Sequence, residues 1–477
     1  MYNIKGIKGC NYNFLIIIEG SSKMRDKLIT ATFFITIFLF LTIPVSSIFA
    51  QSEGGTLKLD QLIEEALSNN PELKAARERA DAYRERPPQA SSLEDPRITL
   101  GFSNLPVDDF DFNKQDMTQK VISLSQEIPL PGVLSLKKEN ATQEANAMGK
   151  RVREFESILV KRVKKSYYDL YFINKAIDIT EANQGLLKEF VEITKTRYSV
   201  GRGIQQDVLK AQVELSKMVE KIIDLEQKKA SVKAEINTLL NRPQEISLLE
   251  PPDIKKTDFA YSIEELQKMA EEARPALKDV EHLIKSREAT YNLAKKDYLP
   301  SLTFTASYGQ RDNRLRSRPV RATVTPVAGV PSDVTVLSAT DRDRPDFFSF
   351  MVGFKVPLWF HSKQSRKIKE NLTLVSEAKS KREALKNKIF FDIKDVLEKE
   401  KRGAKLIKLY QKDIIPQAKA SLDSAMAAYE VGSVDFITLL DSQLTLFNYR
   451  LNYYQVLADY EKDLAELEAV VGKRLFQ

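Results

Sequence analysis

The chain has 477 residues, 43% of them apolar and 29% charged, a composition that excludes wholesale disorder and allows roughly two to four domains. Its net charge is +7. One cysteine, Cys10, and two histidines, His282 and His361, exclude an intrachain disulfide framework and leave no ligand set for a Cys/His zinc site.

The first fifty residues have the pattern of an export signal. Basic residues at 24–27 precede the apolar run 28–43, and small residues then lead to a cleavage point after Ala50. No other run is apolar enough to raise the question of a membrane helix, which excludes a multi-span helical protein; an uncleaved anchor at 28–43 is the alternative. Cleavage would remove five basic and two acidic residues, lowering the net charge from +7 to +4. This weak excess does not indicate a nucleic-acid partner, and the loss of Cys10 leaves no cysteine to carry a lipid.

The rest of the chain consists of two related halves. Four positions recur at an offset of 204 residues, where Leu62, Ala66, Pro71 and Leu73 return as Leu266, Ala270, Pro275 and Leu277. Further on, Tyr198-x2-Gly201 returns as Tyr429-x2-Gly432 in the same order. We therefore predict a tandem duplication, with an upstream extension and signal peptide at 1–50, a first structural repeat at 51–245 and a second at 246–477.

Each repeat reads as a helix, two strands and two long helices. Asn70-Pro71 and Arg274-Pro275 mark helix starts, because proline at the first helical position loses no hydrogen bond. Strict alternation predicts the strands, at about 98–102, 122–128, 302–308 and 348–356. The 3-4 spacing of apolar residues predicts long helices at about 133–198 and 208–239, and matching helices with a less regular seam at about 360–430 and 437–471. Residues 311–345 form a long arginine-rich loop, expected on the outer cell face.

The predicted strands place bulky apolar residues on one face and small hydroxyl residues or glycine on the other. With the residues that flank these alternating positions, each segment is about nine to ten residues long, the length of a tilted membrane-crossing strand. Pro129 and Pro357 end the ladder because proline donates no ladder hydrogen bond. A half-buried sheet of a water-soluble protein shows the same alternation and is the alternative. Since open strand edges are not tolerated in hydrocarbon, four membrane strands require oligomerisation. Two chains would give a barrel filled by side chains, whereas three would leave a lumen.

The long helices carry heptad seams, which indicate coiled-coil packing. Taken alone, heptads favour a structural coiled-coil protein. That class does not explain paired strands of membrane length inserted at the same place in each repeat.

Two motifs at the turns between long helices, RYSVGRGIQQDV (197–208) and YEVGSVDFITLLD (429–441), resemble those of the TolC-like outer-membrane efflux proteins. The resemblance covers nearly the whole chain after residue 50. It implies a mixed α/β membrane protein in which long coiled-coil helices form a periplasmic α-barrel. Four transmembrane β-strands per protomer would complete a twelve-stranded barrel as a homotrimer in the outer membrane of a Gram-negative-type bacterium. The implied partners are outer-membrane lipid, a periplasmic adaptor and an inner-membrane pump of the resistance-nodulation-division type.

The same resemblance implies a periplasmic gate at the helix turns. Tyr429 and Asp207 match the tyrosine and aspartate that latch the closed tip, and Asp441 matches one of the aspartates that ring its narrowest point. The second ring position is Thr438 and the latch arginine is Val434, so a weaker latch and a less acidic ring are expected. The alternative is that Tyr429 is a seam residue and the aspartates are solvated helix caps.

The cargo is inferred from one motif. SQEIPLPG (125–132) is similar to the strand-exit motif of relatives that export heavy-metal cations, which makes a passive exit duct for such cations the first hypothesis. A multidrug or protein-secretion duct is the second, and a structural envelope protein the third. No catalytic activity, cofactor or resident metal is expected. The one partial cofactor motif, Gly201-x-Gly203, lies between helices and lacks the rest of a dinucleotide fingerprint.

Overall fold

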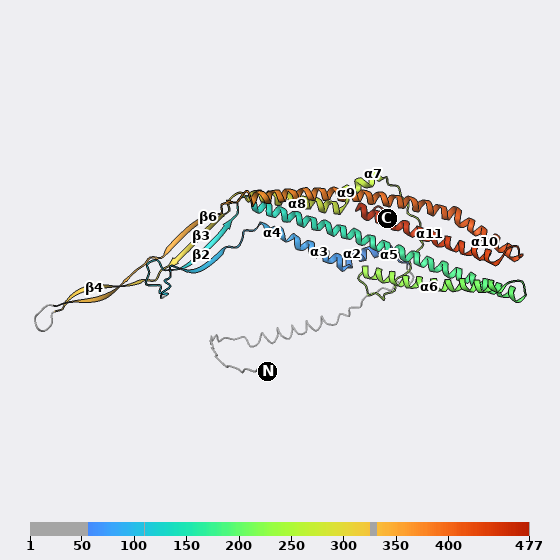
Figure 1. Ribbon diagram of the computed structural model, residues 1–477, viewed down its shortest axis with the longest axis horizontal. Coiled ribbons are helices and arrows are strands. Elements are labelled where there is room, and N and C mark those ends of the chain that lie inside the picture. The colour runs from blue at the N-terminus through green and yellow to red at the C-terminus, as the bar shows by residue number, and fades with distance from the viewer. Residues whose placement is uncertain (1–55, 109, 325–331, 477) are drawn as a thin grey trace, which may run out of the picture. The chain divides into compact units, whose positions relative to one another are not determined.

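The computed structural model describes residues 56–108, 110–324 and 332–476 (Figure 1). The predicted export signal at 1–50, with Cys10, lies outside the described residues. In the first half the order is helices, hairpin, helices. The elements are α2 (Leu59–Asn69), α3 (Pro71–Arg84), α4 (Arg86–Ser91), β1 (Arg97–Ser103), β2 (Gln119–Ile128), α5 (Val133–Ser199) and α6 (Gln205–Leu239).

The second half follows the same order with one hairpin added. Its elements are α7 (Ile263–Ala273), α8 (Pro275–Lys296), β3 (Leu302–Gln310), β4 (Arg314–Val324), β5 (Ser332–Arg342), β6 (Phe347–Phe354), α9 (Gln364–Leu409), the π-helical turn η1 (Tyr410–Ile414), α10 (Ile415–Glu430) and α11 (Phe436–Val471). The long helices predicted from the 3-4 spacing are confirmed. The longest, α5, has 67 residues and so spans about 100 Å at 1.5 Å per residue.

The helix starts predicted at Pro71 and Pro275 are confirmed, because α3 and α8 begin there. The single leading helix predicted for each half is incomplete, since α2 and α7 precede these starts and the chain breaks between each pair. Asn70 and Arg274 have extended ψ angles of 122° and 116°, since the residue before a proline avoids the helical region. Asn70 also joins the break to a distant helix. Its Oδ1 accepts the Leu73 amide at 3.0 Å, and its Nδ2 donates to the Leu239 carbonyl at 3.0 Å.

The helix predicted at 360–430 contains a π-helical turn over Tyr410–Ile414. Pro416 lies just beyond this turn, near the start of α10. It cannot donate the hydrogen bond that an α-helix would require there, and wider turns form where the regular ladder is interrupted.

The sheet joins the two halves of the chain. Its strands are antiparallel in the order β1-β2-β3-β6, which leaves β1 and β6 as edges. The register pairs Leu124 with Ile98 on one side and with Ala306 on the other. The last strand ends two residues earlier than predicted, at Phe354 rather than Val356, although the Lys355 amide still donates to the Ser301 carbonyl at 3.2 Å.

The segment expected as a 35-residue loop contains a second sheet. Strands β4 and β5 pair as an antiparallel hairpin, in which Pro319 stands opposite Leu337. Arginines occupy alternate positions of β4, so there was no apolar alternation to indicate a strand. Two arginines next to the hairpin attach it to the loop between β1 and β2: Arg344 donates to the Gln115 carbonyl at 2.7 Å, and Arg311 donates to the Asp116 carbonyl at 3.1 Å.

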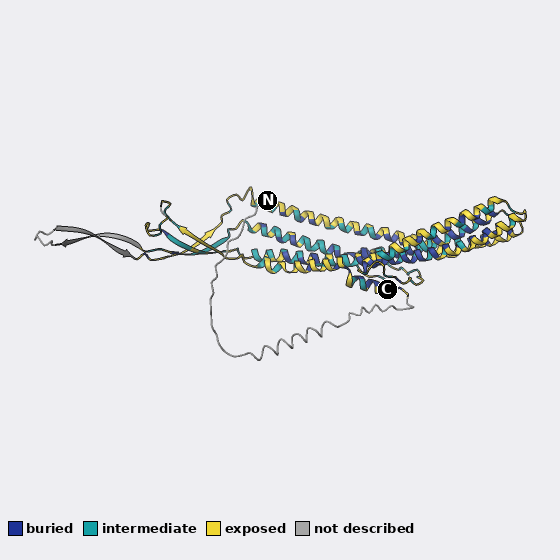
Figure 2. Cartoon of the chain, turned by 90° about the horizontal axis from the view of Figure 1, so that it is seen from below, coloured by how far each residue is buried: buried dark blue, intermediate teal, exposed yellow. Residues whose placement is uncertain are grey.

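Burial is concentrated along the helices, not in the sheet (Figure 2). The leucines and alanines that recur at the offset of 204 are core residues, which explains their identity in the two halves. Each of Leu62, Ala66, Leu73, Leu266, Ala270 and Leu277 is at most 2% exposed. No helix in the described part of the chain is long and apolar enough to cross a membrane.

Candidate functional site

One face of the sheet is apolar and exposed. The register places apolar residues of all four strands on it, among them Ile98, Leu100, Phe102, Ile122, Leu124, Phe304, Tyr308, Phe348, Phe350, Val352 and Phe354. Leu100 and Phe348 are each 74% exposed. The opposite face carries small polar residues and glycine, including Thr99, Gly101, Ser123, Ser125, Thr305, Ser307, Ser349 and Gly353. A continuous exposed apolar face on one side of a strand ladder is suited to lipid, and a small polar face to water.

Two tight turns join the long helices in pairs, α5 to α6 and α10 to α11. Gly201 and Gly432 each adopt φ of +76°, a conformation that side chains disfavour, which accounts for the glycine repeated after Tyr198 and Tyr429. Both turns lie at the end of the helices farthest from the sheet (Figure 1). We refer to the residues at these turns, 197–207 and 429–441, as the tip.

Arg197 connects the two turns. Its Nη2 donates to the Tyr429 carbonyl at 2.7 Å and to the Glu430 carbonyl at 3.0 Å, at the C-terminus of α10. Its guanidinium also lies over the Tyr429 ring, with Cζ 4.1 Å from the ring centroid. A cation at the negative end of a helix dipole is favourable, and so is its contact with an aromatic face. Arg197 begins the first tip motif, but its contacts with α10 were not predicted from the sequence.

The predicted latch pair lies at the tip without a mutual hydrogen bond among the described residues. Tyr429 is 7% exposed and packs against Phe436 with ring centroids 5.9 Å apart. Burial raises the pKa of the Tyr429 hydroxyl above its usual value. The charge of Arg197 opposes this increase and the charge of Asp207 adds to it, so both charged groups influence the hydroxyl. Burial also raises the pKa of Asp207, and the charge of Asp435 adds to this effect.

The remaining gate positions have separate surroundings. Asp441 is exposed and makes no ion pair with any described residue. Thr438, at the second ring position, helps to cap α11: its amide donates to Asp435 Oδ1 at 2.9 Å and its hydroxyl to the same oxygen at 2.5 Å. Val434, at the position of the family's latch arginine, packs against the apolar core of the tip. The Asp435 cap was missed, although the Asp-x-x-Thr spacing before an apolar run could have indicated it.

Two buried amide side chains, those of Asn183 and Gln443, lie among α5, α6 and α11, inside the apolar core next to the tip. The Gln443 side chain donates to Asn183 Oδ1 at 2.7 Å, and Asn183 Nδ2 donates to the Met218 sulfur at 3.2 Å. Asn183 and Gln443 are at most 5% exposed. Because burying these amides unpaired is costly, their hydrogen bonds favour this one alignment of the three helices.

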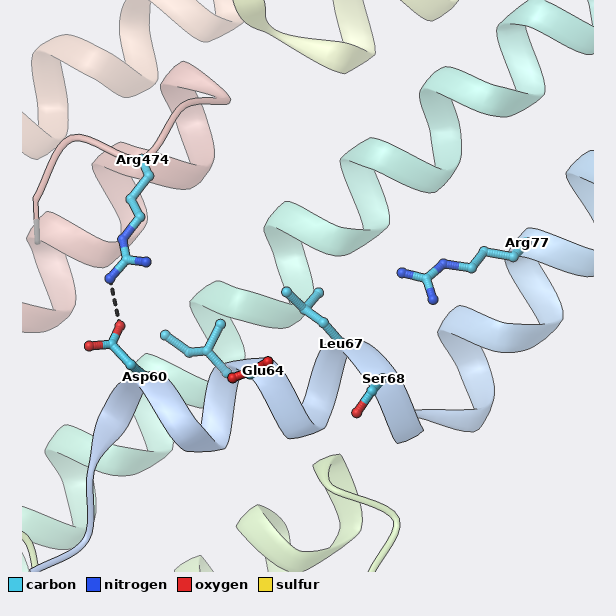
Figure 3. Close-up of a pocket in the computed structure, with 7 residues that line it drawn as sticks. Asp60, Glu64, Leu67, Ser68, Arg77 and Arg474 are labelled. Atoms are coloured by element: carbon cyan, nitrogen blue, oxygen red, sulfur yellow. Dashed lines mark hydrogen bonds and ion pairs between the residues drawn. The ribbon is translucent and has the colours of Figure 1, made fainter.

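Other regions offer weaker candidate sites. A pocket of about 900 Å³ lies beside α2 and is bounded by Asp60, Leu67 and Arg77 (Figure 3). Arg474 Nη2 donates to Asp60 across one side of it at 2.6 Å. His282 contacts Gln143 through Nδ1 at 2.7 Å between α8 and α5. Among the described side chains, no group of three or more His, Cys, Asp or Glu is placed to hold a metal ion.

Comparisons with known proteins agree with this architecture. A family model described as "Outer membrane efflux protein" matches residues 62–242 and again 266–473. The outer membrane protein TolC of Vibrio cholerae serotype O1 is 22% identical over 420 residues, which cover 87% of this chain and 90% of that protein.

Two solved structures show the same fold. That of CusC has a TM-score of 0.71 at 15% identity, covering 87% of this chain and 92% of CusC. That of VceC from Vibrio cholerae has a TM-score of 0.70 at 15% identity, covering 87% of this chain and 96% of VceC.

These matches confirm the predicted fold class and the outer-membrane location with extension into the periplasm. The two matched segments together make up well over half of the chain. The chain therefore belongs to the outer membrane efflux protein family, whose members are efflux channels rather than enzymes.

Proposed function

We propose that the chain is the outer-membrane exit duct of a tripartite efflux system, a passive channel for small solutes driven by an inner-membrane pump. The observation that carries this proposal is the exposed apolar face shared by β1, β2, β3 and β6, on a sheet joined directly to helices about 100 Å long. That combination provides a wall in the membrane and a conduit beyond it. The partners proposed for this role are a periplasmic adaptor and a pump of the resistance-nodulation-division type.

The sheet supports a homotrimer. Its edge strands β1 and β6 are unpaired within the described chain, and unpaired backbone groups are not tolerated in hydrocarbon. Pairing β6 of one protomer with β1 of the next satisfies both edges. Three protomers then close twelve strands around a lumen lined by the small polar face. The internal duplication, with repeats at 51–245 and 246–477, would give such a trimer six similar units around its axis.

Heavy-metal cations are the cargo that the strand-exit motif favours. In the structure this motif ends β2 and begins α5, where Gly132 adopts φ of +89°. Its role is thus to turn the chain from strand to helix, and its support for metal cargo comes from resemblance alone. A multidrug or protein-secretion duct is the second proposal.

The tip is proposed as the gate. Asp207 and Tyr429 remain the proposed latch and Asp441 the proposed constriction residue, to which the structure adds Arg197. If opening separates the α5–α6 pair from the α10–α11 pair, the bonds from Arg197 to the α10 carbonyls must break. Asp441, which is exposed and has no ion-pair partner in the described chain, is free to attract a transiting cation.

The topology predicts that a cysteine at Ser332, in the hairpin beyond the sheet, is labelled from outside the cell. In a Cys10→Ser background, Ser332→Cys should react with a membrane-impermeant maleimide in intact cells. Ser216→Cys, on exposed α6, is the matched control and should react only after the outer membrane is permeabilised. The opposite pattern would reverse the orientation and reject the proposed duct.

A further inference from the structure

A pocket of about 560 Å³ lies where the strands meet the long helices. Its walls come from the end of β2, the chain before β3 and after β6, the end of α8 and the starts of α5 and α9. We call it the neck pocket. The proposed gate lies at the other end of the helices and does not involve it.

The neck pocket opens on the polar face of the sheet. Glu127 pairs with Thr303, and Thr303 pairs with Gly353, so these residues share a face. The ladder continues one step further, since the Lys355 amide donates to the Ser301 carbonyl at 3.2 Å. Glu127, Ser301 and Lys355 all line the pocket. In the proposed duct this is the face that lines the bore.

The charge of the neck pocket is positive. Five lysines line it against three carboxylates, Glu94, Glu127 and Asp297. Lys367 is paired with Asp297 at 2.6 Å. The other four, Lys137, Lys296, Lys355 and Lys363, make no ion pair with any side chain that the structure describes. An unpaired ammonium cluster favours a negatively charged ligand.

The remaining wall is apolar. Leu130, Leu134 and Leu293 line it together with Trp359, whose side chain is 75% exposed. Exposed aromatic area beside unpaired cations is suited to a ligand with an apolar body and one charged group. Gln364 also lines the pocket, and its Oε1 is buried with no hydrogen-bond partner, which leaves an acceptor for a ligand donor.

We propose that the neck pocket binds an anionic amphiphile, an organic molecule with a carboxylate or similar anion held by Lys355 and Lys363 and an apolar body against Trp359. This inference rests on the proposed function, because it treats the polar face of the sheet as the wall of the bore. It assigns the neck of the duct an organic, negatively charged ligand, in addition to the heavy-metal cations proposed from the strand-exit motif.

Trp359 is the only tryptophan of the chain and therefore reports on the neck pocket directly. The full chain is reconstituted in phosphatidylcholine nanodiscs, and energy transfer from Trp359 is titrated with dansylglycine, neutral dansylamide and cationic dansylcadaverine. A Trp359→Phe variant supplies the background. Dansylglycine should bind saturably, at least about tenfold more tightly than the other two, and unlabelled octanoate should displace it.

Charge variants test the lysines. Lys355→Gln with Lys363→Gln should weaken dansylglycine binding about tenfold and leave dansylamide transfer unchanged. The matched control, Lys165→Gln with Lys388→Gln, removes two exposed lysines of α5 and α9 and should leave both unchanged. Equal binding of the three probes, or tighter binding of dansylcadaverine, would overturn the inference. Ser332→Cys labelling separates the two failures: correct labelling without dansylglycine binding rejects only the anion site, whereas reversed labelling rejects the duct.

Discussion

Replacing Arg197 by alanine should open the tip and raise the resting single-channel conductance in planar bilayers. The substitution removes the hydrogen bonds to the Tyr429 and Glu430 carbonyls and the contact with the Tyr429 ring. Hydrogen bonds from a charged donor contribute about 1.5–3 kcal/mol. The loss in each protomer therefore shifts the open-to-closed ratio by about tenfold or more. Trimer mass and heat stability of the barrel should not change, because Arg197 lies far from the sheet.

The control for Arg197→Ala is Lys195→Ala. Lys195 is an exposed cation of the same helix whose ion-pair partner is Glu192, one turn away at 2.7 Å. Removing it deletes the same charge without breaking a contact between the helix pairs, so the conductance should stay close to that of the unaltered protein. Equal conductance of both variants and the unaltered protein would show that other contacts hold the tip.

The hydroxyl–carboxylate latch inferred from the family resemblance can be tested separately from the contacts of Arg197. Tyr429→Phe with Asp207→Ala deletes a hydroxyl and a carboxylate but keeps the ring and the carbonyls that Arg197 contacts. A large conductance increase in this double variant would support a hydroxyl–carboxylate latch, whereas a small one would assign the closed tip to Arg197. Asp441→Asn should change cation selectivity more than resting conductance, because Asp441 has no contact in the described structure that would hold the tip closed.

A charge on the apolar face of the sheet should abolish assembly. Phe350→Arg places a guanidinium near the middle of β6, on the face assigned to lipid. Such a substitution costs about 2–4 kcal/mol at the middle of a bilayer, and a trimer carries it three times. We expect the trimer recovered from outer-membrane fractions to fall by at least about tenfold.

Met351→Arg is the matched control, because it places the same group one residue later on the opposite face of β6. That face is proposed to meet water, so the assembled trimer should remain. Its conductance and ion selectivity should change instead. Loss of assembly in Met351→Arg with normal assembly in Phe350→Arg would exchange the two faces and remove the basis of the proposed bore.

Much of the fold followed from the sequence because its patterns are long and local. Few other folds are compatible with helical spacing over more than sixty residues and strict alternation in four strands. The departures arose where a single residue overrides a pattern. Pro416 adjoins a π-helical turn inside the helix predicted at 360–430. Pro71 and Pro275 begin helices as predicted, but each separates its helix from a preceding short one, α2 or α7, that was not predicted. The hairpin of β4 and β5 was missed because arginines, rather than apolar residues, occupy the alternating positions at the start of β4.

The site was less predictable, because its contacts join residues far apart in the chain. The resemblance marked Asp207, Tyr429 and Asp441, but it could not show that Arg197 meets backbone carbonyls more than 200 residues away. Backbone acceptors leave no trace in side-chain identity. The neck pocket likewise brings together segments that no motif connects, and only the register shows that Glu127, Ser301 and Lys355 share a face.

The mass of the particle in mild detergent tests the central claim most directly, since a four-stranded sheet with two open edges cannot form a channel alone. Native mass spectrometry of the full-length protein extracted from outer membranes should give three protomers per particle. The same trimer should conduct in planar bilayers. A stable monomer inserted in lipid, or a dimer that conducts, would contradict the account.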